Sequence, residues 1–209
     1  MRITLINASP KMNNSTSGSF LNMFKSNFEN TADVVEMNLR IPMLTEEQKT
    51  ILSNSDKIVF AFPLYVDGIP GHLLSCLVEM EQKKLVKSGS FVYGIVNCGF
   101  YEGIQTETAL RVLENWCDKV GVLWGGGLGI GGGGAMAYMP ETLGTNGPMA
   151  TIGKEIKTLA EHLKAGYIGE NHYAQLAIPR FFYKLGGEMG WRNMARTNGL
   201  TKSDLDRKL

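Results

Sequence analysis

Five apolar runs of strand length, separated by segments with helical spacing, constrain the fold of this chain more than any other feature. The runs are rich in Val, Ile and Phe and begin at residues 3, 34, 57, 91 and 122, where they read ITLI, VVEMNL, KIVFAF, FVYGIV and VLWGGGLGI. Two of them are nearly unbroken, as is typical of strands buried on both faces. Strands that alternate with helices predict βαβ units, right-handed crossovers and a parallel sheet.

The segments between these runs carry apolar residues at the spacing of an amphipathic helix. Helices are predicted over residues 17–30, from Pro70 through Met80, over 102–120 and over 154–167. We therefore predict an α/β fold in which a doubly wound, five-stranded parallel sheet carries helices on both faces. This domain is expected at residues 1–168. Residues 169–209 are expected to form a C-terminal helical extension that packs on the domain or on a dimer mate, although Gly186, Gly187 and Gly190 weaken that helix.

Composition excludes several classes of protein. The 209 residues carry a formal net charge of +1, which implies no general attraction to nucleic acid. Cys76, Cys98 and Cys117 are an odd number of cysteines without CxxC spacing, which is typical of a reducing compartment, so we expect a cytoplasmic protein. The three histidines show no metal-ligand spacing, and no metal site is expected.

One uncharged stretch, from Lys119 to Glu141, is long enough to span a bilayer. Nine of residues 121–139 are glycine, however, and glycine is a poor helix former. We interpret the stretch as a buried strand that runs into a glycine loop, and membrane insertion as unlikely on this sequence. The glycines contain a GxGxxG match without a clear ribose-binding acid, so a backbone that passes close to a ligand, a neighbouring subunit or the edge of the fifth strand is favoured over a dinucleotide fingerprint.

Three loops follow the first, third and fourth predicted strands and read NASPKMNNSTSG, PLYVDGIPG and NCGFYEG. In an open parallel sheet, ligands bind beyond the carboxyl ends of the strands. The first loop is rich in hydroxyls and enters a helix, whose free N–H groups and dipole favour a phosphate. The other two add aromatic and backbone surfaces suited to a flat ring, so together the loops predict a mononucleotide site. A generic helix cap remains the alternative for the first loop.

These loops resemble those of the flavodoxin-like NAD(P)H-dependent FMN reductase family. The family's first loop reads G-S-P-(R/K) before an Asn/Ser/Thr-rich helix start, and here Ala8, Ser9, Pro10 and Lys11 precede residues 13–17. PLYVDGIPGHLL and NCGFYEG are similar to its second and third flavin loops, and the resemblance extends to about residue 165. Ala8 replaces the usual glycine, and Asn14 stands where glycine is common. Asn tolerates left-handed backbone geometry, which makes this replacement acceptable.

The resemblance implies FMN as cofactor, NAD(P)H as co-substrate and a flavodoxin-like fold. By position, the FMN phosphate would lie on the first loop, at Ser9, Lys11, Ser15, Thr16 and Ser17. The ring and ribityl chain would lie along Pro63, Leu64, Tyr65 and Val66. The other side of the ring would be bordered by Asn97, Cys98, Gly99, Phe100 and Tyr101. Tyr65 and Tyr101 could equally be packing residues, and Cys98 is expected to be a small buried residue rather than a redox thiol.

The predicted activity is hydride transfer from NAD(P)H to FMN, which then reduces a small acceptor such as a flavin, a quinone or a similar electrophile. Flavin supplies the redox chemistry, which explains why the sequence shows no convincing acid–base constellation. A flavodoxin-type electron carrier or a non-catalytic flavin-binding module is the alternative. A homodimer is expected because related reductases often dimerise. A third idea, a membrane or partner helix in the tail, is weakened by its glycines.

Overall fold

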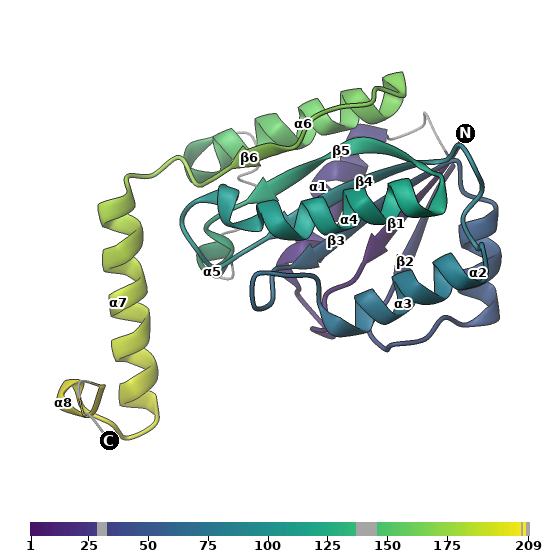
Figure 1. Ribbon diagram of the computed structural model, residues 1–209. Helices are drawn as coiled ribbons and strands as arrows, with labels where there is room; N and C mark the ends of the chain where they lie inside the picture. Colours follow the sequence, from purple (N-terminus) through teal and green to yellow (C-terminus); the bar gives the residue numbers. More distant parts are fainter. Residues whose placement is uncertain (29–32, 137–145, 206, 208–209) are drawn as a thin grey trace. The chain divides into compact units, whose positions relative to one another are not determined.

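The computed structural model describes residues 1–28, 33–136, 146–205 and 207 (Figure 1). The chain divides into two compact units, Met1–Leu176 and Ala177–Leu209. The first unit contains a parallel sheet between two layers of helices, and the second is helical.

The sheet has six parallel strands in the order β2-β1-β3-β4-β5-β6. The first five match the apolar runs of the sequence to within one residue at each end: β1 Arg2–Asn7, β2 Asp33–Asn38, β3 Lys57–Pro63, β4 Phe91–Asn97 and β5 Leu123–Ile130. The strand order reverses at β1, which pairs with β2 on one side and β3 on the other. This reversal makes the carboxyl ends of β1 and β3 a topological switch point, where ligands of open α/β sheets bind.

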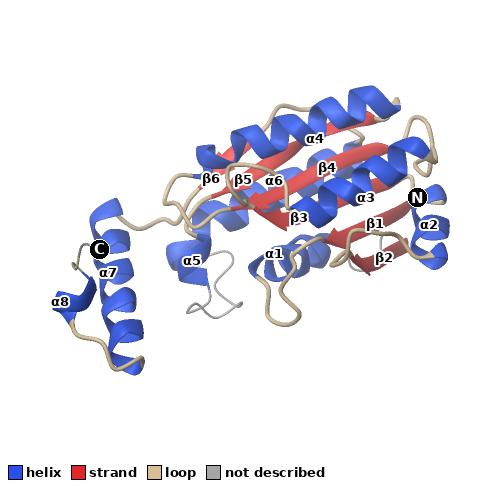
Figure 2. Cartoon of the chain, turned by 60° about the horizontal axis from the view of Figure 1, so that its bottom comes forward, coloured by secondary structure: helices blue, strands red, loops and turns tan. Residues whose placement is uncertain are grey.

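Helices cover both faces of the sheet (Figure 2). The side with α2 (Glu46–Ser53), α3 (Gly71–Gln82) and α4 (Glu107–Val120) holds an extensive cluster of buried hydrophobic residues. In this cluster Phe60 of β3 meets Trp116 of α4 edge to face, with ring centroids 6.2 Å apart. Alternate strand residues point to the opposite face, which α1 (Thr16–Lys25) and α6 (Ala150–Ala165) cover.

Short elements complete the first unit: η1 Ser26–Phe28, η2 Gly103–Thr106, α5 Gly133–Met136 and η4 Gly147–Met149. Two helices end at a left-handed glycine, Gly121 after α4 and Gly166 after α6, with φ of 75° and 65°. Glycine adopts this conformation without a Cβ penalty, so each glycine ends its helix before the chain turns toward the next element.

The sixth strand corrects the prediction of five. β6 comprises only His172–Ala174 and pairs with the carboxyl half of β5, where Leu128 lies opposite His172. Three residues without an apolar run give no strand signal in the sequence. Because this pairing ties residues 172–174 to the sheet, the first unit extends to Leu176, beyond the expected boundary at residue 168.

The second unit contains α7 (Arg180–Thr197) and α8 (Lys202–Leu205). α7 runs without interruption through Gly186, Gly187 and Gly190, the residues expected to weaken it. Within the described part of this unit, Ala195 is the one buried residue. No described helix of the chain is both long and apolar enough to cross a membrane.

Candidate flavin site

The three loops singled out in the sequence follow β1, β3 and β4, which are adjacent strands of the sheet. All their carboxyl ends therefore lie at one edge. Backbone hydrogen bonds continue the sheet into the loops: the Ala8 amide donates to the Ala61 carbonyl at 2.8 Å, and the Leu64 amide to the Asn97 carbonyl at 2.8 Å. The fold thus brings the fourteen predicted site residues to the same edge, on three loops that begin in register.

The first loop is shaped by Asn7, the last residue of β1. Its side-chain amide donates to the Ser15 hydroxyl at 3.1 Å, and its side-chain carbonyl accepts from the Ser9 amide at 3.1 Å. The Ser9 hydroxyl in turn accepts from the Lys11 amide at 3.3 Å. Ser9 is buried and acts inside the loop, whereas the Lys11 side chain is exposed at its surface.

The end of this loop builds the start of α1. Asn14 has φ of 50°, so asparagine does adopt the left-handed geometry for which glycine is common. Ser15 is the N-cap, and its hydroxyl accepts from the Gly18 amide at 3.1 Å. Thr16 is half-buried in the first turn, and its hydroxyl makes no hydrogen bond within the described residues. The first turn contains no acidic side chain, so its free N–H groups remain favourable for an anion.

The side chain of Ser17 is engaged within the protein. It is buried, and its hydroxyl donates to the side-chain carbonyl of Asn97 at 2.7 Å. This bond links the first turn of α1 to the end of β4. The Ser17 hydroxyl proton is therefore committed to the protein, and its backbone N–H is the donor that remains for a ligand.

The second loop forms a tight reversal. The backbone groups of Tyr65 and Gly68 exchange two hydrogen bonds, of 3.1 and 3.0 Å, around Val66 and Asp67. Both central residues have positive φ, 47° for Val66 and 57° for Asp67. Such a conformation is costly for a β-branched residue, and Val66 is fully exposed at its tip. Tyr65 is also exposed, whereas Pro63 and Leu64 are half-buried.

The third loop rests on the glycines that follow β5. The Gly132 and Gly133 amides donate to the carbonyls of Phe100 and Cys98, at 2.5 and 2.8 Å. A Cβ on Gly131 would lie 2.1 Å from the Tyr101 carbonyl oxygen. The glycine segment therefore packs its backbone directly against the third loop, at a distance that leaves no room for side chains.

Within this loop, Asn97 and Cys98 are buried, Tyr101 is half-buried, and Gly99 and Phe100 are exposed. Burial raises the pKa of the Cys98 thiol, and its sulfur lies 3.7 Å from the Glu102 carbonyl oxygen. Cys98 is thus a structural residue, as predicted, and its thiol is not activated. Among the described residues, no group of His, Cys, Asp and Glu could hold a metal ion.

Two side chains that are not among the predicted site residues form hydrogen bonds with backbone carbonyls of the first loop. His72, in the first turn of α3, makes a hydrogen bond of 3.1 Å through Nε2 to the Ala8 carbonyl, so that nitrogen carries the proton. Arg40, after β2, donates through Nη2 to the Met12 carbonyl at 3.1 Å. His72 lies within the segment PLYVDGIPGHLL and Arg40 lies in none of the motifs, but the sequence predicts neither contact, and only the tertiary structure reveals them.

No protein-family model matches the chain, and no curated protein matches it. Solved structures do match. A protein from P. pentosaceus, described as an NADPH-quinone reductase, is 19% identical with a TM-score of 0.54, over 79% of this chain and 97% of that one. An NADH:FMN oxidoreductase in its apo form is 14% identical with a TM-score of 0.55, over 79% and 89%. A flavodoxin from Streptococcus pneumonia is 12% identical with a TM-score of 0.57, over 79% and 99%.

The chain has a flavodoxin-like fold. These likenesses confirm the predicted α/β architecture, and the matched proteins are of the kinds that the resemblance of the loops led us to expect. At such identities they establish the fold alone, so the role of each loop residue rests on the geometry described above.

Proposed function

We propose that the protein is an FMN-dependent oxidoreductase that takes hydride from NADH or NADPH and reduces a small acceptor, such as a flavin, a quinone or a similar electrophile. The observation that carries this proposal is the convergence of three loops at the switch point of a flavodoxin-like sheet. One loop leads into a helix whose first turn has no acidic residue, and the other two present aromatic and backbone surfaces.

The residues fit the parts of FMN. The N–H groups of Thr16 and Ser17, the Thr16 hydroxyl and the Lys11 ammonium would hold the phosphate, while Ser9 and Ser15 shape the loop around it. Pro63, Leu64, Tyr65 and Val66 would line one side of the ring and ribityl chain. Asn97, Cys98, Gly99, Phe100 and Tyr101 would border the other side.

Flavin, when bound, supplies the two-electron chemistry, so the protein has to bind it, orient it and leave one ring face open. The tight turn at Val66 and the glycine-backed third loop are both braced by backbone hydrogen bonds. Rigid backbone of this kind suits orientation of a ring. Exposed Tyr65 and Phe100 offer apolar contact to an incoming co-substrate or acceptor.

A flavodoxin-type electron carrier, or a non-catalytic flavin-binding module, is the second candidate. One observation favours it: residues 1–176 contain 14 basic and 17 acidic residues, a net charge of −3, although the whole chain is at +1. An acidic surface aids docking to basic redox partners. We favour the reductase because a simple electron carrier does not require a second, basic unit.

Anaerobic titration separates the two candidates. The purified protein, saturated with FMN, is mixed with NADH or NADPH while the visible flavin absorbance is recorded. Rapid bleaching by either co-substrate, and recovery on addition of a quinone, is expected for the reductase. A flavin that stays oxidised with both would identify a carrier or a binding module.

The phosphate turn gives a second test. FMN should bind more tightly than riboflavin, because riboflavin lacks the group that the N–H donors of the first turn serve. Calorimetry with both ligands measures the difference in affinity. Equal affinities would contradict the proposal that this loop binds the FMN phosphate.

We also propose that the protein is a cytoplasmic homodimer that binds neither nucleic acid nor a membrane. The exposed apolar residues of α7 support association, because exposed apolar surface is often buried in an interface between subunits. Light scattering at micromolar concentration tests the dimer, and a monomeric mass would contradict it.

A further inference from the structure

Two cavities lie next to each other at the carboxyl end of β2, on the side of the first loop away from β3 and β4. One measures about 220 Å³ and the other about 300 Å³. Met12 and Asn38 line both, so the cavities share a wall. Ordinary ligand sites measure about 300–1,000 Å³, so each cavity suits one part of a larger ligand.

The smaller cavity lies between α1 and the edge strand β2 and is predominantly polar. Its floor is aliphatic, from Leu5, Leu21 and Met37. Its walls carry amide, hydroxyl and carboxylate groups, from Asn14, Ser19, Asn22, Glu36 and Asn38. The one carboxylate, that of Glu36, forms an ion pair with Lys25. The neutral hydrogen-bond donors and acceptors around it suit the hydroxyl groups of a sugar.

The larger cavity is predominantly apolar. Three large apolar side chains border it and are unusually exposed: Met12 at 69%, Ile41 at 53% and Met43 at 60%. Single exposed apolar residues are ordinary, but a group of them around a cavity indicates binding. Methionine is polarizable and adapts to flat aromatic groups, so this cavity suits a ring such as a base.

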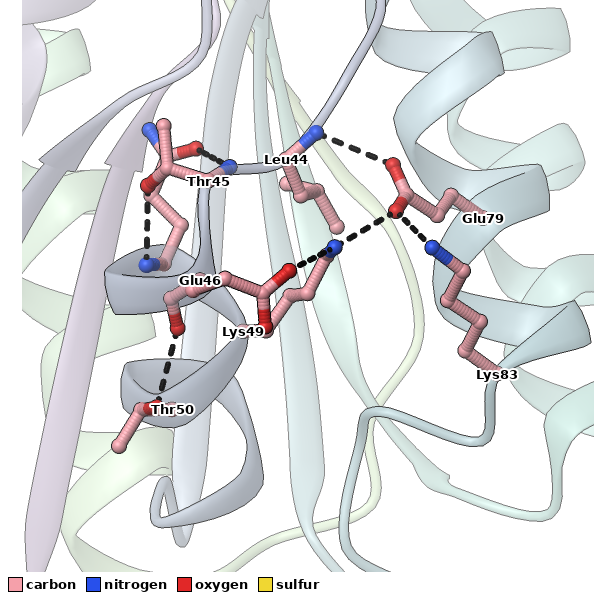
Figure 3. Close-up of polar contacts among 8 residues, drawn as sticks. Leu44, Thr45, Glu46, Lys49, Thr50, Glu79 and Lys83 are labelled. Carbon is pink, nitrogen blue, oxygen red and sulfur yellow. Dashed lines mark hydrogen bonds and ion pairs between the residues drawn. The ribbon is translucent and has the colours of Figure 1, made fainter.

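The segment that carries Ile41 and Met43 is anchored through the neighbouring Leu44, whose contacts with Glu79 are drawn in Figure 3. Glu79 of α3 accepts from the Leu44 amide at 3.0 Å and pairs with Lys49 and Lys83, at 3.3 and 2.7 Å. The Cys76 thiol donates to the Ile41 carbonyl at 3.4 Å. The segment between β2 and α2 is therefore preorganised with its apolar side chains outward.

Arg40 joins this wall to the first loop. Its Nη2 donates to the Met12 carbonyl and to the Asn38 side-chain carbonyl, both at 3.1 Å, while its buried Nε has no partner in the described structure. The Gln48 side chain also donates to the Asn38 carbonyl at 2.9 Å. Arg40 thus holds both residues that the two cavities share, Met12 and Asn38, and Gln48 holds Asn38 as well.

We propose that the two cavities form a nucleoside subsite, in which the polar cavity takes the ribose and the apolar cavity takes the base of an AMP group. The placement supports a dinucleotide. Neighbouring strands lie about 4.8 Å apart, so the end of β2 is one strand from the first loop and about 10–15 Å from the ring loops after β3 and β4. Dinucleotides in doubly wound sheets stretch across neighbouring strand ends in this way.

Two dinucleotides carry the same AMP chemistry. In FAD the AMP is joined to the phosphate that the first loop would hold, and in NADH it is joined to the nicotinamide that must reach the ring. The choice of source rests on the proposed function, but the presence of an AMP subsite does not.

The subsite is tested by calorimetry with AMP on the full chain saturated with FMN, which fills the phosphate turn. AMP should bind at least tenfold more tightly than ribose 5-phosphate, which lacks the base. The double substitution Ile41→Ser with Met43→Ser should weaken AMP binding at least tenfold, and Asn22→Leu, at an exposed position of α1, should weaken it severalfold. Val112→Ser, which changes an exposed apolar residue of α4, is the matched control and should bind AMP as the parent does.

Two further measurements distinguish the sources. If FAD is the source, FAD binds at least tenfold more tightly than FMN, and the double variant loses this preference. If the nicotinamide dinucleotide is the source, FMN and FAD bind equally, and the double variant raises KM for NADH while kcat stays unchanged. AMP that binds no better than ribose 5-phosphate, or equally well to the parent and both variants, would overturn the subsite. Failure to bind any flavin would instead contradict the proposed function, and the AMP titration can then be done on flavin-free protein.

Discussion

The two units of this chain use the same apolar residue types in opposite ways. In Met1–Leu176 the large apolar residues of the strands are buried between helices, as Phe60 is against Trp116. In Ala177–Leu209 they are exposed, as Phe181 is at 69%. The charges differ too, since the first unit has a net charge of −3 and the second, with 7 basic and 3 acidic residues, of +4.

This difference indicates where the stability of each unit comes from. A sheet covered on both faces is stabilised by its own core, whereas a single helix owes most of its stability to packing. A helix with apolar residues exposed on several sides is typical of an element that a partner covers. The first unit is therefore expected to fold by itself, and α7 to depend on what it binds.

The largest contrast is expected from the same substitution in both units. Phe60→Ala removes a fully buried ring and should lower the free energy of unfolding by about 3–5 kcal/mol. Phe181→Ala should change it by less than about 0.5 kcal/mol, because the ring is exposed. Urea unfolding at low protein concentration measures both. Equal losses would mean that α7 is part of the core.

FMN binding is expected to depend on the first unit, and in particular on Thr16. A hydrogen bond to a charged group contributes roughly 1.5–3 kcal/mol, so Thr16→Ala should weaken FMN binding by about one to two orders of magnitude. Riboflavin affinity and the melting temperature of the flavin-free protein should stay the same. Because Ser15 rather than Thr16 is the N-cap of α1, earlier melting with unchanged FMN affinity would contradict this donor assignment.

Glycine-to-alanine substitutions should have opposite signs in the two units. A Cβ on Gly103 would lie 2.4 Å from the Ala174 carbonyl oxygen and 2.6 Å from that of Gly129. Gly103→Ala should therefore destabilise the sheet domain by about 1–3 kcal/mol. Gly187 has open space around it within α7, so Gly187→Ala should stabilise that helix by about 0.5–1 kcal/mol. Thermal melts and far-UV circular dichroism measure the two effects. A change in stability of the same sign in both variants would contradict this prediction.

The smallest effect is expected from the surface cluster around Glu79. Hydrogen bonds from Lys83 and from the Leu44 amide, with a further one from Lys49, lower the pKa of Glu79 to about 2, from an ordinary 4.5. Because the folded-state pKa is depressed, this contribution to stability is present above about pH 4.5 and is lost as the pH falls toward 2. The difference in unfolding midpoint between the parent and Glu79→Gln should therefore shrink between pH 6 and pH 3. A difference that is independent of pH would show that the carboxylate charge is unimportant.

Much of the fold could be predicted because its signals are local. The five long strands match apolar runs to within one residue at each end, and α4 and α6 end at glycines that follow helical spacing. The strand β6 could not be found, since three residues gain strand structure only by pairing with β5. The helix α7 persists through three glycines that local propensity disfavours, so propensity alone was a weak guide there.

The candidate site divides in the same way. The sequence by itself determined which loops meet at one edge of the sheet, because parallel strands put all their carboxyl ends there, and it identified Asn14 as a residue that accepts left-handed geometry. Only the tertiary structure decided which atoms remain free for a ligand. The Ser17 hydroxyl is committed to Asn97, eighty residues away in the chain, and His72 and Arg40 reach the first loop from other elements. Such contacts depend on how distant segments meet, and no local pattern of residues encodes them.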